Sequence, residues 1–339
     1  MICIIALIVF GILGIFSASH RQLAKEAFDC VFRRITLRKC TTGLDVRLKS
    51  HITSKFLEKS PKAGAFVYRY FELLSWFFTI LMIASIIWTG ISAYNYYIYG
   101  NCNGASLEDQ EKTCLFDPHG ENSQISTAEG NATISNAPPT IDGVNLSLFP
   151  AYQGKSIKDE MVYVGCYACP NTKKVNPEIN QLVGENRDTL KLVFIHLPLH
   201  KEYEYLLNIE NCLYQENKAA YWTFHQKMMD LPKEEVKDKE KVLTLLTQIK
   251  EINASKILAC SESKEAQELS EKQLQEIHKM NIKGTPTIFV NGEVFIGPKP
   301  MRVYEMQLST YVNWFSISLF SLLGIIIAIL LYYGIFKRG

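Results

Sequence analysis

The strongest constraint on this chain of 339 residues is a run of apolar residues from Leu73 to Tyr94, which has no ionisable side chain before Tyr94. A helix needs about 20 such residues to cross a bilayer. Two other apolar runs, one at the start of the sequence and one near its end, are about as long. We therefore expect a multi-pass protein of the cell membrane, with transmembrane helices at residues 1–19, 71–97 and 311–336.

Each apolar run also has an alternative interpretation. A buried helix of a soluble protein is the alternative for the second and third, although tryptophan and tyrosine flank both runs, as they do at membrane interfaces. A cleaved signal peptide is the alternative for the first. Signal peptides carry basic residues before the apolar run, whereas this chain starts apolar and becomes basic afterwards. We favour three membrane helices.

The loops between the apolar runs differ in charge. Residues 20–70 contain twelve Lys or Arg and four acidic residues, whereas residues 95–140 contain six acidic residues and one lysine. Positively charged loops stay in the cytoplasm. We therefore place the basic loop 20–70 and the tail 337–339 in the cytoplasm, and the chain from residue 98 to the third helix outside. The net charge of only +2 gives no reason to expect a nucleic-acid partner.

The external part divides into two segments. Residues 98–143 include a stretch rich in Gly, Asn, Ser, Thr and Pro, which predicts a flexible linker. Residues 144–308 are enough chain for one soluble domain. Apolar runs at 161–165 and 190–199 predict buried strands, and residues 202–230 and 235–281 have helical spacing. Two further strands are expected around Asn291-Gly292, a pair typical of a tight hairpin turn. The order of these elements predicts an α/β fold.

Two cysteines three residues apart, Cys166 and Cys169, carry the expected chemistry. They lie between a predicted strand and a predicted helix, and the free N–H groups and dipole at the start of a helix favour a thiolate. A thiolate can attack a disulfide, and a neighbouring thiol can then resolve the mixed disulfide. Taken alone, such a pair could also be half of a metal site or a structural disulfide.

Further motifs accompany this pair: Lys173-Lys174, Pro177-Glu178-Ile179, His196-Leu-Pro-Leu199, the helical segment 212–225, and the segment 284–292 (Gly-Thr-Pro-Thr-Ile-Phe-Val-Asn-Gly). Together with Cys-x-x-Cys-Pro they resemble the DsbA-like branch of the thioredoxin superfamily over residues 144–308, about half of the chain. The resemblance implies a thioredoxin-like fold split by a helical insertion at about residues 201–282. It also implies a cis-proline facing the cysteines, which here is Pro286, with Thr285 before it.

The resemblance leaves two alignments of the cysteine pair open. Family members usually carry Cys-Pro-x-Cys, with a proline eight residues after the first, nucleophilic cysteine. In one alignment Cys169 is the nucleophile, since Pro177 lies eight residues later, and Thr172 replaces the second cysteine. In the other, Cys166 is the nucleophile, and Glu160 lies six residues upstream, where the family often has an acid. We favour the first, because it puts Pro170 at the first helical position, where proline is well tolerated.

The remaining cysteines are expected to be structural. Outside the reducing cytoplasm, Cys102 and Cys114 are expected to form a disulfide. Cys212 and Cys260 are candidates for a second disulfide, with two buried apolar cysteines as the alternative. In the basic loop we expect reduced thiols at Cys30 and Cys40, with a zinc site that also uses His20 and His51 as the less favoured alternative.

These features together predict a membrane-anchored, extracytoplasmic thiol-disulfide oxidoreductase. It would form, isomerise or reduce disulfides in exported proteins, exchange electrons with a separate membrane redox partner, and need no cofactor or metal, because the two cysteines carry the electrons. The alternatives are a Cu(I) relay that uses both thiolates, or a non-catalytic thioredoxin-like binding module. His196 and His225 have no evident role, and we expect them at a strand end and on a helix surface.

Overall fold

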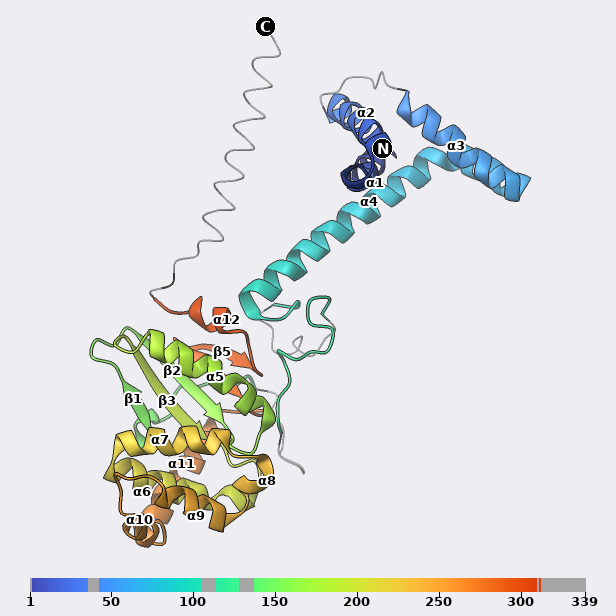
Figure 1. The fold of residues 1–339 in the computed structure, drawn as a ribbon. Helices are drawn as coiled ribbons and strands as arrows, with labels where there is room; N and C mark the ends of the chain where they lie inside the picture. Colours follow the sequence, from blue (N-terminus) through green and yellow to red (C-terminus); the bar gives the residue numbers. More distant parts are fainter. Residues whose placement is uncertain (1, 36–42, 105–113, 128–136, 310, 312–339) are drawn as a thin grey trace. The chain divides into compact units, whose positions relative to one another are not determined.

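The structure is a computed structural model that describes residues 2–35, 43–104, 114–127, 137–309 and 311. It divides into two compact units, Met1–Ile91 and Ser92–Gly339, which are considered separately below. Figure 1 shows their helices and strands along the chain. The predicted span 311–336 lies almost wholly outside the described residues.

The first unit is helical. It contains α1 (Ile2–Phe16), α2 (Ala18–Ile35), α3 (Leu44–Lys59) and most of α4 (Pro61–Tyr99), which continues into the second unit. Helices α1 and α2 pack against each other, and Ala6, Ala27 and Leu44 form a small core. The basic loop predicted at 20–70 is thus largely helical where it is described.

Among the described helices, α4 alone is long and apolar enough to cross a membrane. At about 1.5 Å per residue, the 15 residues of α1 reach about 22 Å, less than the roughly 30 Å of a hydrocarbon core. The span expected at 71–97 therefore coincides with a suitable helix. The spans expected at 1–19 and 311–336 remain predictions.

The expectation of a reduced thiol at Cys30 is wrong. The sulfur of Cys30 is disulfide-bonded, and it also lies 2.8 Å from the sulfur of Cys3. Cys40 lies outside the described residues. The expectation depended on the charge of the loop, and loop charge carries no information on which sulfur atoms come together in the fold.

The second unit contains a five-stranded mixed sheet with the order β1-β3-β2-β4-β5. The strands are β1 (Ala151–Gln153), β2 (Asp159–Gly165), β3 (Leu190–His196), β4 (Thr287–Val290) and β5 (Glu293–Ile296). Strands β2 and β3 are parallel and joined by α5 (Pro170–Glu185), whereas the other neighbours are antiparallel. This arrangement confirms the expected α/β fold, here with a mixed sheet covered by helices. The short strand β1 is an addition that the sequence analysis did not predict.

A set of helices lies between β3 and β4 in the chain, and Figure 1 shows most of it grouped at one side of the sheet. Its members are α6 (Tyr205–Glu216), α7 (Lys218–Asp230), α8 (Lys233–Val236), α9 (Lys239–Thr247), α10 (Ala254–Ser261) and α11 (Lys264–Lys279). Single 3-10 turns at Leu146–Leu148 and Lys201–Tyr203 and a short helix α12 (Met301–Glu305) complete the unit. The set occupies the region where the resemblance implied an insertion.

Alternation along β2 divides the core between the two faces of the sheet. Met161 and Tyr163 point into the larger cluster, which also contains Cys166 and Cys169, whereas Val162 and Val164 point into a smaller cluster on the other face. Because β2 is central and buried on both faces, it is apolar along almost its whole length. The cysteine pair therefore lies where the central strand leaves a well-packed core.

The turn between β4 and β5 has the predicted geometry. Asn291 and Gly292 have φ angles of 50° and 91°, which are the positive values that a type I′ turn requires at both central positions. Hydrogen bonds from the Asn291 amide to Asp159 Oδ1 and to the Gln307 carbonyl fix this turn to its neighbours. The hairpin holds β4 beside β2 and so positions the segment that precedes β4.

Candidate active site

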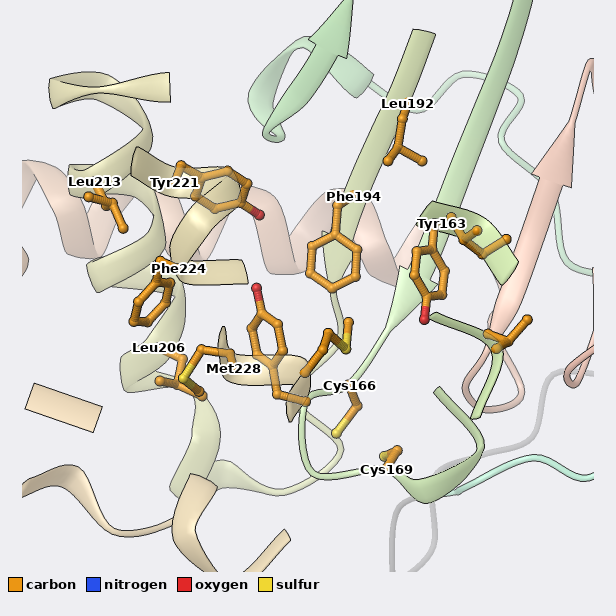
Figure 2. Close-up of a cluster of buried hydrophobic side chains, with 14 of the residues drawn as sticks. Tyr163, Cys166, Cys169, Leu192, Phe194, Leu206, Leu213, Tyr221, Phe224 and Met228 are labelled. Atoms are coloured by element: carbon orange, nitrogen blue, oxygen red, sulfur yellow. The ribbon is translucent and has the colours of Figure 1, made fainter. Parts of the chain in front are cut away.

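The two cysteines occupy the turn between β2 and α5. Cys166 directly follows β2, Cys169 is the N-cap residue of α5, and Pro170 is the first residue of that helix. The Cys169 N–H donates to the Cys166 carbonyl at 3.0 Å, which closes the turn. Figure 2 shows both side chains at the edge of the buried cluster. Neither forms a disulfide in the structure, so the pair is in its dithiol form.

Hydrogen bonds and packing contacts with Thr172 fix the position of this turn. The Cys166 N–H donates to the Thr172 hydroxyl at 3.3 Å, and the Tyr163 hydroxyl donates to the Thr172 carbonyl at 2.9 Å. A Cβ atom at Gly165 would come within 2.8 Å of the Thr172 methyl group, so only glycine fits there. Thr172, which replaces the second cysteine in the favoured alignment, is thus a buried support for Cys166.

The segment before β4 reaches the cysteines from the other side. Val164 of β2 is paired with Thr287 of β4, which brings Thr285 and Pro286 close to the end of β2. The Thr285–Pro286 peptide bond is cis. Thr285 is fully buried, and its hydroxyl has no hydrogen-bond partner within normal geometry. The structure therefore brings together all four residues proposed from the sequence for catalysis.

The two thiols differ in acidity. A hydrogen bond from the Cys166 thiol lowers the pKa of Cys169 to about 7, and the hydroxyl groups of Thr285 and Ser126 and the charge of His196 act in the same direction, while burial opposes them. The same hydrogen bond, followed by burial and the charge of Cys169, raises the pKa of Cys166 well above its usual range. Cys169 also stands at the N-terminus of a 16-residue helix, which favours a thiolate. The lower pKa of Cys169 favours its thiolate at neutral pH, whereas the Cys166 thiol keeps its proton.

This acidity predicts a pH profile. The alkylation of Cys169 by iodoacetamide can be followed by mass spectrometry. Its rate is expected to be half-maximal near pH 7 and about one tenth of the maximal rate at pH 6, because only the thiolate reacts. The Cys166→Ala variant loses the largest stabilising contact, so its midpoint should move upward toward the ordinary value of about 8.5. A midpoint near 8.5 in the unaltered chain would contradict the assignment.

A buried polar cluster lies beside the cysteine turn. The Glu210 carboxylate accepts from the Tyr167 hydroxyl at 2.5 Å, from the Tyr221 hydroxyl at 3.4 Å and pairs with His196 Nδ1 at 2.7 Å. The Tyr167 hydroxyl is also 3.1 Å from His225 Nδ1, and burial followed by the charge of His196 lowers the pKa of His225 to about 3. Tyr167 lies between the two cysteines in sequence, so this cluster fixes one end of the active-site turn.

This cluster was not predicted from the sequence, and His225 is not on a helix surface as expected, whereas His196 does lie at the end of β3 as expected. His196 and His225 are almost fully buried, so neither is a surface residue. A carboxylate at position 210 on an otherwise apolar helix face was the available signal, because a buried charge requires partners. The partners come from elements far apart in the chain, and no spacing rule connects them.

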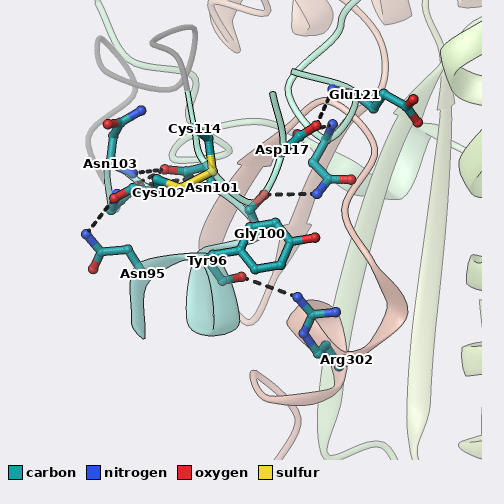
Figure 3. Close-up of a disulfide and its surroundings, with 12 residues drawn as sticks. Asn95, Tyr96, Gly100, Asn101, Cys102, Asn103, Cys114, Asp117, Glu121 and Arg302 are labelled. Carbon is teal, nitrogen blue, oxygen red and sulfur yellow. Dashed lines mark hydrogen bonds between the residues drawn. A yellow bond between two sulfur atoms is a disulfide. The ribbon is translucent and has the colours of Figure 1, made fainter. Parts of the chain in front are cut away.

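The other candidate cysteines are paired in the structure. Cys212 and Cys260 form a disulfide between α6 and α10, with 5.9 Å between their Cα atoms. Cys102 and Cys114 form another, with 5.2 Å between their Cα atoms, and Figure 3 shows it beside the end of α4. Within the described ranges, no group of three or more His, Cys, Asp or Glu side chains could hold a metal ion.

Comparison with known proteins agrees with this fold. Residues 155–309 match a family model described as Thioredoxin. No curated protein matches the chain. Several solved structures are similar over about half of it. BdbD from Bacillus subtilis in its oxidised form is 20% identical with a TM-score of 0.42, and the match covers 50% of this chain and 94% of that chain.

Two further solved structures have a similar sequence identity and TM-score. The thiol-disulfide exchange protein alpha-DsbA2 from Wolbachia pipientis is 17% identical with a TM-score of 0.41, over 47% of this chain and 84% of that chain. The catalytic domain of ScsC from Proteus mirabilis is 16% identical with a TM-score of 0.40, over 52% and 93%.

The match of residues 155–309 to this family model agrees with the expected resemblance to the thioredoxin superfamily. The helices α6 to α11 lie between β3 and β4 in the chain, where the resemblance to the DsbA-like branch implied an insertion.

Proposed function

We propose that this protein is a thiol-disulfide oxidoreductase that exchanges disulfides with other proteins through Cys166 and Cys169. The observation that carries the proposal is the placement of two thiols in one turn, with Cys166 directly after β2 and Cys169 at the N-terminus of α5, where the helix favours a thiolate. Such a pair can transfer two electrons without a cofactor.

In the reducing direction, the Cys169 thiolate attacks one sulfur of a substrate disulfide. A bond forms between Cys169 and that sulfur, and the other substrate sulfur leaves as a thiolate. Cys169 is then neutral, so the charge and hydrogen bond that held the Cys166 proton are lost. The Cys166 thiolate attacks the Cys169 sulfur, forms the Cys166–Cys169 disulfide and releases the second substrate thiolate. Oxidation of a substrate dithiol follows the same steps in reverse.

We also propose that α4 crosses a membrane, with residues 144–308 outside the cytoplasm and exported proteins as substrates. Helix α4 supports it, since a soluble protein rarely exposes so much contiguous apolar surface. Its exposed large side chains include Trp76, Phe77, Phe78, Ile80, Leu81, Ile83, Ile86, Ile87, Trp88 and Ile91. The disulfides at Cys102–Cys114 and Cys212–Cys260 fit an oxidising compartment. A separate membrane redox partner would return the cysteine pair to its starting redox state.

The full chain in detergent micelles tests the proposed function. It should accelerate either the reduction of insulin by dithiothreitol or the refolding of a scrambled disulfide protein. The matched control is the double variant Cys166→Ser with Cys169→Ser, which should have no activity. Activity that survives in this control would contradict the proposal, and stoichiometric Cu(I) binding without exchange would favour the metal relay instead.

A further inference from the structure

A short segment that precedes the domain in sequence lies across the active site. Residues 121–127, which we call the strap, belong to the region where the sequence predicts a flexible linker. Ser126 forms an isolated antiparallel bridge with Thr285. The Ser126 N–H donates to the Thr285 carbonyl at 2.8 Å, and the Thr285 N–H donates to the Ser126 carbonyl at 2.9 Å. The strap thus satisfies both backbone polar groups of the residue before the cis-proline.

The strap also reaches the nucleophile. The Ser126 hydroxyl is one of the groups that lower the pKa of Cys169. Cys169 is only 6% exposed and Cys166 only 1% exposed. Disulfide exchange requires a second sulfur to approach the attacking thiolate along its line of attack. With so little of Cys169 open to solvent, a protein disulfide cannot reach it while the strap is in place.

The domain is shaped to receive the strap. A Cβ atom at Gly284 would lie 2.6 Å from the Ser126 carbonyl oxygen, and one at Gly297 would lie 2.8 Å from the carbonyl carbon of Ser123. Both positions therefore need glycine for the strap to fit. The buried Lys299 ammonium donates to the Asn122 carbonyl at 2.6 Å, which holds the start of the strap.

The chain before the strap is also fixed. Asp117 accepts from the N–H groups of Glu121 and Asn122, both at 2.9 Å, and Cys114, three residues before Asp117, is disulfide-bonded to Cys102, as Figure 3 shows. Beyond Ser126 the contacts differ. Thr127 is exposed, and Ser126 is joined to the domain backbone by a single bridge. The start of the strap is therefore fixed by Asp117 and Lys299, whereas over the thiols it is held by the bridge between Ser126 and Thr285 and by its fit against Gly284.

We propose that the strap occupies the position where a substrate segment binds. There it covers the dithiol, and it must leave before a protein disulfide can react. This inference builds on the proposed function. An extended polypeptide segment that replaces the strap would form the same two backbone hydrogen bonds with Thr285. Its cysteine would take the position of Ser126, beside Cys169. The substrate is thus an extended polypeptide segment that contains a cysteine. To bind, it must displace the chain's own strap.

A cysteine introduced into the strap tests this placement. The full-length Ser126→Cys chain is first oxidised with glutathione disulfide, so that Cys166 and Cys169 form a disulfide. The new thiolate should attack the Cys169 sulfur, which forms a bond between residues 126 and 169 and releases Cys166 as a thiolate, with no further oxidant. The matched control is Thr127→Cys, one residue further along the chain. Mass spectrometry under non-reducing conditions should find the 126–169 crosslink at least about tenfold more often than the 127–169 crosslink.

A second variant tests the covering role and does not depend on the crosslink. Ser126→Pro removes the N–H that donates to Thr285, and loss of one such hydrogen bond should open the strap about fivefold more often. The measured quantity is the ratio of two alkylation rates of Cys169, the rate with a bulky maleimide divided by the rate with iodoacetamide. This ratio should rise about fivefold. Gln124→Pro, at an exposed position of the same strap, is the comparison. An unchanged ratio in Ser126→Pro, or equal crosslinking from positions 126 and 127, would overturn the proposal.

The outcomes of these experiments distinguish a failure of the strap proposal from a failure of the proposed function. If the unaltered chain catalyses no exchange but the 126–169 crosslink forms selectively, the strap is correctly placed and the function is wrong. If the chain catalyses exchange and neither strap variant changes access to Cys169, the function stands and the strap proposal fails.

Discussion

Replacing Cys169 with serine is expected to reduce the rate of mixed-disulfide formation with a protein substrate by at least about 1,000-fold, the scale seen when an activated nucleophile is removed. The reason is that Cys169 holds the acidic thiol, with a pKa of about 7, whereas the remaining Cys166 thiol is only 1% exposed and its burial raises its pKa. The measurement is the rate at which the reduced full chain forms a covalent complex with a peptide disulfide at pH 7.

The matched variant is Cys166→Ser. It keeps the attacking thiol but lacks the resolving one, so its mixed disulfide should accumulate and not turn over. Peptide mapping should place the crosslink at Cys169. If instead Cys169→Ser reacts at the normal rate and Cys166→Ser is inert, Cys166 is the nucleophile, and the alignment that makes Cys166 the first family cysteine is correct.

Removing the Glu210 carboxylate is expected to lower the free energy of unfolding by about 3–5 kcal/mol, the usual cost of breaking a buried charged pair. Glu210→Ala leaves three buried donors without their acceptor, namely Tyr167, Tyr221 and His196. Glu210 is only 2% exposed, so water cannot replace the carboxylate without reorganisation of the core. The measurement is urea unfolding of the full chain in a mild detergent, followed by the protease resistance of residues 144–308.

Glu210→Gln is the control for this prediction. It preserves the shape and one acceptor oxygen, so it should cost clearly less than Glu210→Ala. Equal stability of Glu210→Ala and the unaltered chain would show that the cluster contributes little to stability.

The parts of the fold that the sequence predicted correctly are those with local signals. The apolar run that became β2, the helical spacing of α6 to α11 and the Asn291-Gly292 turn each depend on neighbouring residues. The cysteine pair was found because its two members are three residues apart and precede a helix. Such features are visible in a single sequence because the physics that produces them acts over one turn or one strand.

The features that the sequence analysis missed depend on contacts between distant segments. Glu210 of α6 meets His196 of β3, Tyr167 of the turn after β2 and Tyr221 of α7, so no periodicity reveals the cluster. The bridge between Ser126 and Thr285 joins a segment rich in Gly, Asn and Ser to the start of β4, and its composition predicted only a linker. The disulfide at Cys30 was missed for a related reason, because the charge of a loop does not specify its sulfur contacts.

The central claim is that Cys166 and Cys169 form one reversible two-electron couple. The most direct measurement is equilibration of the full chain with glutathione buffers of known potential, with the Cys166–Cys169 disulfide quantified by mass spectrometry after acid quenching. The account predicts a single two-electron transition with a midpoint between about −270 and −120 mV, the range of thioredoxin-fold exchange proteins. If the two cysteines stay unlinked at every potential, the claim is wrong.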